Sequence, residues 1–123
     1  MINTRICIRI AAALAAASLF APAAALADSY YAQAWARVDV DGSLLAGQNV
    51  VSSEMISTGT YCVRFTPEID PATSAIVATL RHDDRTISAH GPGDACGDDP
   101  SGVTVRIYQQ ERPAIGSFDL AIL

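Results

Sequence analysis

The feature that most constrains the fold of this chain is a strict alternation of side-chain character with a period of two residues. The clearest example spans residues 31–40, where one face holds Ala32, Ala34, Ala36, Val38 and Val40 and the other holds Tyr31, Gln33, Trp35, Arg37 and Asp39. Successive side chains of a β-strand point to opposite faces, so this alternation predicts a strand. No helical spacing persists over two turns between residues 28 and 123. The sequence therefore predicts an all-β domain.

Turn-forming residues divide the chain into seven such segments. The predicted strands are residues 31–40, 49–58, 61–66, 74–82, 86–90, 103–109 and 117–123. Residues 44–47 are predicted to be a connection and residues 111–113 a turn, while Asp83-Asp84 predicts a tight hairpin between the fourth and fifth strands. Short strands at this spacing indicate a sandwich or a small barrel, and of these we expect an antiparallel β-sandwich of jelly-roll or immunoglobulin-like type.

The N-terminus has the composition of an export signal. Two arginines and no acidic residue precede an apolar run over residues 10–21, and Ala25-Leu26-Ala27 fits a signal-peptidase site. The run is shorter than the about 20 residues of a membrane-spanning helix. We therefore expect a cleaved signal peptide over residues 1–27 and a single domain over residues 28–123. The product would be secreted or periplasmic, with no membrane insertion after cleavage.

The net charge of the exported domain limits the classes of partner that it can bind. Cleavage would leave 123 − 27 = 96 residues with six basic side chains, all arginine, against 13 acidic ones, a formal charge of 6 − 13 = −7. Nucleic-acid binding depends on clustered cations, so no nucleic-acid partner is expected. The absence of lysine, with abundant alanine, arginine and aspartate, is typical of GC-rich bacterial genes.

Cysteine usage predicts one disulfide bond. Cys7 belongs to the predicted signal peptide, which leaves Cys62 and Cys96 as an even pair in an oxidising compartment. The loop that this bond would close contains 96 − 62 + 1 = 35 residues. The chain-entropy model gives such a loop about 4 kcal/mol of stabilisation.

The order of strand and turn residues is similar to that of a group of small secreted bacterial β-domains. The segments that carry the likeness are Asp41-Gly42, residues 49–53, residues 59–65, residues 77–80, residues 103–106 and residues 118–120. The likeness extends over nearly the whole of residues 28–123. Because these landmarks are structural, the resemblance implies the all-β architecture and carries over no catalytic residue, cofactor or partner.

Tyr31 and Trp35 form a candidate binding surface. If the alanine face of residues 31–40 packs in the core, these two aromatic side chains make an exposed stripe of the kind that binds a sugar or a protein. If the aromatic face packs inward, they are core residues. The usual burial of tryptophan favours the second interpretation.

The longest loop, residues 91–102, is the second candidate surface. It holds Asp94, Asp98 and Asp99 beside Cys96, together with four glycines. Loops on rigid β scaffolds commonly carry recognition. The three carboxylates also leave open a calcium site, and the Cys96 anchor leaves open a protease-inhibitor loop, although no recognisable reactive-site sequence is present.

Two histidines supply the remaining chemical alternative. His82 and His90 would lie at the ends of the predicted hairpin, where Asp83 and Asp84 could join them in a metal site. Ser88 shares a face with His90, which leaves open a small hydrolase. No nucleophile-elbow, metal or cofactor motif accompanies them. The sequence therefore favours a non-enzymatic binding or structural module at or outside the cell envelope, with an unspecified protein, glycan or envelope surface as its partner.

Overall fold

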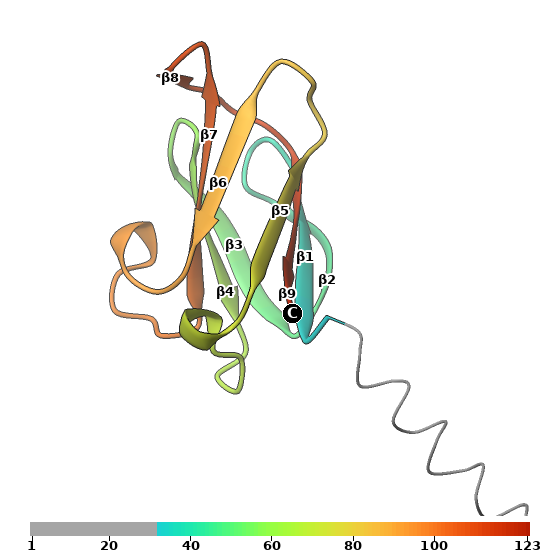
Figure 1. Ribbon diagram of the computed structural model, residues 1–123, viewed down its shortest axis with the longest axis vertical. Coiled ribbons are helices and arrows are strands. Elements are labelled where there is room, and N and C mark those ends of the chain that lie inside the picture. The colour runs from blue at the N-terminus through green and yellow to red at the C-terminus, as the bar shows by residue number, and fades with distance from the viewer. Residues whose placement is uncertain (1–31) are drawn as a thin grey trace, which may run out of the picture. The chain divides into compact units, whose positions relative to one another are not determined.

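The computed structural model describes residues 32–123. The predicted signal peptide and Tyr31 lie outside the described residues. Within residues 32–123 there are nine strands and two 3₁₀ turns, η2 (Pro71–Thr73) and η3 (Asp94–Cys96), and no α-helix (Figure 1). The strands are β1 Ala34–Val38, β2 Leu44–Gln48, β3 Val50–Ser57, β4 Thr60–Phe65, β5 Ile76–Leu80, β6 Thr86–His90, β7 Gly102–Gln109, β8 Arg112–Pro113 and β9 Phe118–Ile122. No helix in this part of the chain is long and apolar enough to cross a bilayer.

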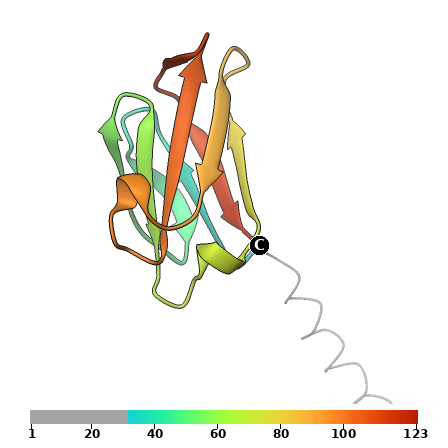
Figure 2. The same cartoon turned by 60° about the vertical axis from the view of Figure 1, so that its left-hand side comes forward.

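The strands form two sheets in which every pair is antiparallel. Sheet A has the order β2-β1-β9-β5, and sheet B has the order β3-β4-β7-β6, with the short β8 paired to β7. Figures 1 and 2 show β6 and β7 in one sheet and β1, β9 and β5 in the other. The prediction of an antiparallel all-β fold is confirmed.

The two sheets share one hydrophobic core. Sheet A contributes Ala34, Ala36, Val38, Phe118, Leu120 and Ile122, and sheet B contributes Tyr61, Val63, Phe65, Val103, Val105 and Ile107. In sheet A the small residues of β1 lie opposite large residues of β9, with Ala36 beside Leu120. Alternation of small and large side chains on neighbouring strands allows the two sheets to pack closely. The alanine face of β1 is therefore a core face.

Tyr61 connects the core to the segment that follows β1 and to the segment that precedes β9. Its ring packs edge-on against Phe118, with ring centroids 5.2 Å apart. Its hydroxyl donates to the carbonyl of Val40 at 2.7 Å and accepts from the backbone N–H of Gly116 at 3.2 Å. Burial raises the pKa of this phenol above its ordinary value. Tyr61 thus ties two connections to β4 through a hydroxyl that stays protonated at neutral pH.

Two predicted connections are paired strands. Residues 44–48 form β2, an edge strand against β1, where the sequence predicted a connection, and Arg112–Pro113 pairs with β7, where it predicted a turn. β2 is hard to recognise because Gly47 is atypical of a strand. Gly47 is needed because a Cβ there would lie 2.9 Å from the carbonyl oxygen of Trp35, on the paired strand.

The predicted hairpin around Asp83-Asp84 is wrong. β5 pairs with β9 in sheet A, whereas β6 pairs with β7 in sheet B. Residues 81–85 therefore cross from one sheet to the other rather than folding one strand back on its neighbour. A pair of acidic turn residues indicates a chain reversal but does not specify whether the next strand pairs with the preceding one.

Candidate functional site

Trp35 lies on the outer face of sheet A. Its neighbours Ala34 and Ala36 are fully buried in the core, so the side chain between them points away from the core. The expectation that the aromatic face packs inward is therefore wrong. Trp35 is half-buried although the residues directly opposite it are Ala121 on β9 and Gln48 on β2.

A charged group lies next to Trp35 on the same face. Arg37 on β1 is directly opposite Asp119 on β9, with Nε 2.9 Å from Oδ1. Arg81, which follows β5, places Nη2 3.5 Å from the other carboxylate oxygen of Asp119. All three side chains are more than 40% exposed. One carboxylate thus orders two guanidinium groups that stay open to solvent.

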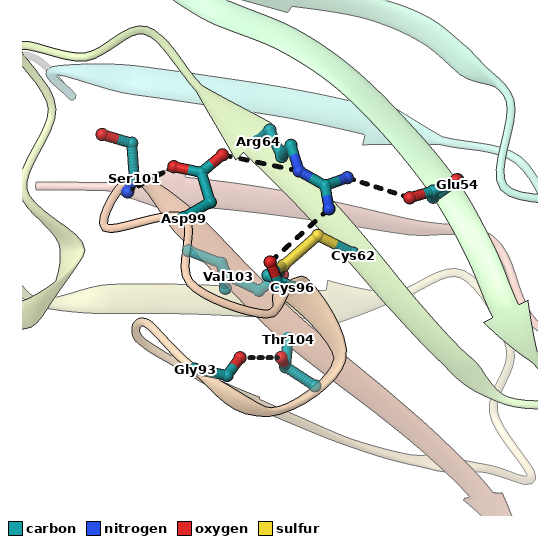
Figure 3. The surroundings of a disulfide bond; sticks show 9 residues. All are labelled: Glu54, Cys62, Arg64, Gly93, Cys96, Asp99, Ser101, Val103 and Thr104. Carbon is teal, nitrogen blue, oxygen red and sulfur yellow. Dashed lines mark hydrogen bonds and ion pairs between the residues drawn. A yellow bond between two sulfur atoms is a disulfide. The ribbon is translucent and has the colours of Figure 1, made fainter.

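The long loop is held against the outer face of sheet B by a disulfide bond between Cys62 on β4 and Cys96 in η3 (Figure 3). The two Cα atoms are 5.2 Å apart, so the predicted disulfide is confirmed. Cys96 is buried, and Thr104 beneath the loop is fully buried, with its hydroxyl donating to the carbonyl of Gly93 at 3.3 Å. The loop is therefore anchored on the sheet at Cys96, while Pro92, Gly97 and Asp98 within it are exposed.

Arg64 fixes the far end of this loop. It bonds Glu54 on β3 through Nη1 at 2.9 Å and Asp99 through Nε at 3.4 Å, and it donates to the carbonyl of Cys96 at 3.5 Å (Figure 3). Asp99 also accepts from the backbone N–H of Ser101 at 2.9 Å. The Asp99 carboxylate is thus engaged in holding the loop closed.

Asp94 is engaged at the other end of the loop. It forms an ion pair with Arg106 on β7 and lies 3.3 Å from Nε2 of His90. The hydrogen bond from Arg106, followed by that from His90, lowers the pKa of Asp94 to about 2. Asp98 is exposed and makes no ion pair within residues 32–123. The structure therefore does not bring the three carboxylates together, and no group of three or more potential metal-ligating side chains occurs in this part of the chain.

A shallow depression of about 290 Å³ adjoins the loop at Pro100. Its lining residues are Val51, Arg64, Phe65, Pro67, Asp99, Pro100 and Ser101. The two charged residues among them are paired with each other, so the depression offers apolar walls and no unpaired charge.

The two histidines lie in different parts of the fold and contact different residues. His82 accepts a hydrogen bond at Nε2 from the backbone N–H of Ser117 at 3.2 Å, beside the last strand of sheet A. His90 is the last residue of β6 and lies directly opposite Thr104 on β7. It is paired with Asp94. Ser88 shares the outer face with His90 but forms no hydrogen bond with it within the described residues. The two imidazoles are therefore not brought together as the hairpin prediction required.

Sequence reasoning missed the partners of Trp35. The alternation placed Arg37 on the face of Trp35, but the pairing of β1 with β9, which adds Asp119 and Ala121, joins residues more than 80 positions apart. Alternation in residues 117–123 would have placed Asp119 and Ala121 on one face of the last strand. No local signal could have identified the strand beside it.

Comparison with known proteins adds no assignment, because no family model, no curated protein and no solved structure matches this chain. The likeness to small secreted bacterial β-domains thus contributes an expected architecture and no function.

Proposed function

We propose that this protein is a secreted, non-enzymatic binding module with β-sandwich architecture, acting at or outside the cell envelope. Its binding surface is the outer face of sheet A around Trp35. The single observation that carries this proposal is the orientation of Trp35, whose indole lies outside the core on a sheet face where Arg37 and Val77 are exposed. A partly exposed aromatic ring on the outer face of a sheet is a surface to which a partner can stack.

The sandwich architecture is supported by the shared core of the two sheets. The two-sheet arrangement also supplies the rigidity that the proposal needs. Trp35 is flanked on both sides by paired strands, and its neighbours in sequence are locked in the core. Because such a surface is ordered before it binds, the cost of fixing side chains on association is small.

Export is supported by two features of different origin. The sequence begins with an export-signal pattern, and Cys62 and Cys96 are joined in a disulfide, which persists mainly in oxidising compartments. Cleavage after Ala27 would place the N-terminus of the product shortly before β1.

The separation of the histidines favours binding over catalysis. A nucleophilic mechanism needs a base within hydrogen-bond reach of a nucleophile, and His90 instead contacts Asp94 and Arg106. The half-buried His82 is occupied by the backbone of Ser117. The surface around Trp35 carries no histidine, serine or cysteine opposite the ring.

The proposal is tested by comparing the purified protein with its Trp35→Ala variant for retention on cell-envelope material and on an array of glycans and proteins. Val51→Ala is the matched control, because Val51 is an exposed apolar residue of sheet B. Binding that is lost in Trp35→Ala and kept in Val51→Ala supports the proposal. Binding that survives Trp35→Ala places the surface elsewhere and overturns it.

A further inference from the structure

We propose that the partner of the Trp35 face is an acidic polysaccharide, with one sugar ring stacked on Trp35 and a carboxylate bound by Arg37 and Arg81. This inference rests on the proposed function, since it names the chemical class of the ligand for the same surface. It follows from the way in which sheet A places an apolar row of side chains beside a charged row.

The apolar row crosses three strands. Trp35 lies directly opposite Ala121, and Ala121 lies directly opposite Val77 on β5, which is 47% exposed. Gln48 closes the row on β2 and presents an amide at its end. Neighbouring strands are about 4.8 Å apart, so Trp35, Ala121 and Val77 form a continuous strip across the sheet.

The charged row runs parallel to it. Arg37 and Asp119 occupy the next outward positions on β1 and β9. Ala46 on β2 lies opposite Arg37, and Thr79 on β5 lies opposite Asp119. Arg81 follows two residues after Thr79 and contacts Asp119. Outward positions two residues apart on a strand are separated by about 6.8 Å. A ligand therefore meets an apolar strip and, one step along the strand, a row of hydrogen-bonding groups. A sugar unit has the same two-sided character, with apolar C–H faces and polar groups at its edge.

Cationic donors lie beside the apolar strip. Arg37 and Arg81 share the carboxylate of Asp119, and Asp39, the next position of the same alternating face, makes no ion pair within residues 32–123. Arg37 bonds Asp119 through Nε, so its two terminal amino groups remain as donors. Guanidinium donors bind carboxylates with two parallel hydrogen bonds. This complementarity points to an anionic ligand rather than a neutral one.

The dimensions of the surface favour a polysaccharide over an acidic protein segment. Protein interfaces concentrate their energy in several anchors buried in pockets. The outward positions beside Trp35 instead offer one indole, one exposed valine and short alanines, and the exposed Leu44 and Leu45 lie apart on the edge strand β2. A sugar ring needs only the flat aromatic surface and donors at its edge.

The test is affinity electrophoresis and titration calorimetry of the full protein with polygalacturonate at about 0.15 M salt, where exposed long-range attraction is screened. Fully methyl-esterified polygalacturonan is the matched neutral ligand, and poly-glutamate is the matched acidic peptide. The variants are Trp35→Ala and Arg37→Gln. Arg112→Gln is the control, because Arg112 is an exposed arginine on sheet B.

We expect binding of polygalacturonate that falls by about tenfold or more in Trp35→Ala, which removes the stacking surface, and in Arg37→Gln, which removes a charge-assisted hydrogen bond. Arg112→Gln should bind like the unmodified protein, and the esterified polymer and poly-glutamate should bind at least about tenfold more weakly. Equal binding of esterified and acidic polymers, lost in Trp35→Ala and unchanged in Arg37→Gln, overturns the acidic ligand and leaves the proposed function standing. Binding of poly-glutamate as tight as that of polygalacturonate, or no binding of polygalacturonate, also overturns the inference. A Trp35-dependent partner of another class, found on envelope material, would then keep the proposed function.

Discussion

Arg37 and Asp119 lie directly opposite each other on the outer face of sheet A, with Nε and Oδ1 2.9 Å apart. The pair joins strands from the two ends of the described chain and lies one outward position from Trp35 and Ala121. An exposed ion pair contributes only about 0–1 kcal/mol to folding. Its larger consequence is the ordering of Arg37 beside the indole, which gives the Trp35 face a fixed arrangement of charge.

Removal of the disulfide should destabilise the domain without changing its strands. The Cys62→Ala/Cys96→Ala double variant is expected to lose about 4 kcal/mol of unfolding free energy, because the bond restrains a 35-residue loop in the unfolded chain. Urea unfolding, followed by circular dichroism, measures the loss. A double variant with the unfolding midpoint of the unmodified protein would show that the bond does not stabilise the fold.

The Asp94 carboxylate should make the stability of the protein depend on pH in the acidic range. Its pKa is lowered to about 2 by hydrogen bonds from Arg106 and His90, so the folded state favours the ionised carboxylate. The stabilisation is fully present above the ordinary value of 3.8 and is lost as the pH falls toward 2. The unmodified protein should therefore be more stable than Asp94→Asn at pH 5, with the difference closing between pH 4 and pH 2.

Asp98→Asn is the control for this pH dependence, because the exposed Asp98 makes no ion pair within residues 32–123. Its stability should follow that of the unmodified protein at every pH. Thermal unfolding at a series of pH values gives both comparisons. A constant difference between the unmodified protein and Asp94→Asn down to pH 2 would contradict the role of the Asp94 carboxylate.

Tyr61→Phe should keep the packing against Phe118 and lose both hydroxyl hydrogen bonds. The carbonyl of Val40 loses its donor and the N–H of Gly116 loses its acceptor, and a buried polar group left unpaired costs about 1–3 kcal/mol. Tyr108→Phe is the matched control, since the Tyr108 hydroxyl makes no hydrogen bond in the described part of the chain. Equal unfolding free energies of the two variants would show that the Tyr61 hydroxyl does not hold these connections.

The sequence predicts those parts of the fold that depend on local pattern. Alternation in residues 61–66 placed Tyr61, Val63 and Phe65 on one face, and all three lie in the core. β2 was missed because Gly47 is atypical of a strand, and a Cβ at this position would lie too close to the Val50 side chain and to the carbonyl oxygen of Trp35. The crossing between β5 and β6 was missed because Asp83-Asp84 indicates a reversal without specifying the sheet of the next strand.

The candidate site was also predicted only where it depends on local sequence pattern. Alternation separated Trp35 from the alanines of β1, but which face is buried depends on Phe118, Leu120 and Ile122, the large side chains of a strand distant in sequence. The long loop was recognised from its glycines and its cysteine. Its packing on sheet B depends on Arg64 and Arg106, which lie on strands that the loop contacts only after folding.

The emission of Trp35 tests the central claim most directly, because this is the only tryptophan in the chain and reports on the proposed surface alone. The measurement is the fluorescence spectrum during titration with polygalacturonate, with binding followed in parallel by calorimetry. If a sugar ring stacks on the indole, the emission changes saturably with the midpoint found by calorimetry, and bound ligand protects Trp35 from quenching by acrylamide. Binding by calorimetry with unchanged emission and unchanged quenching would contradict the claim that partners bind at the Trp35 face.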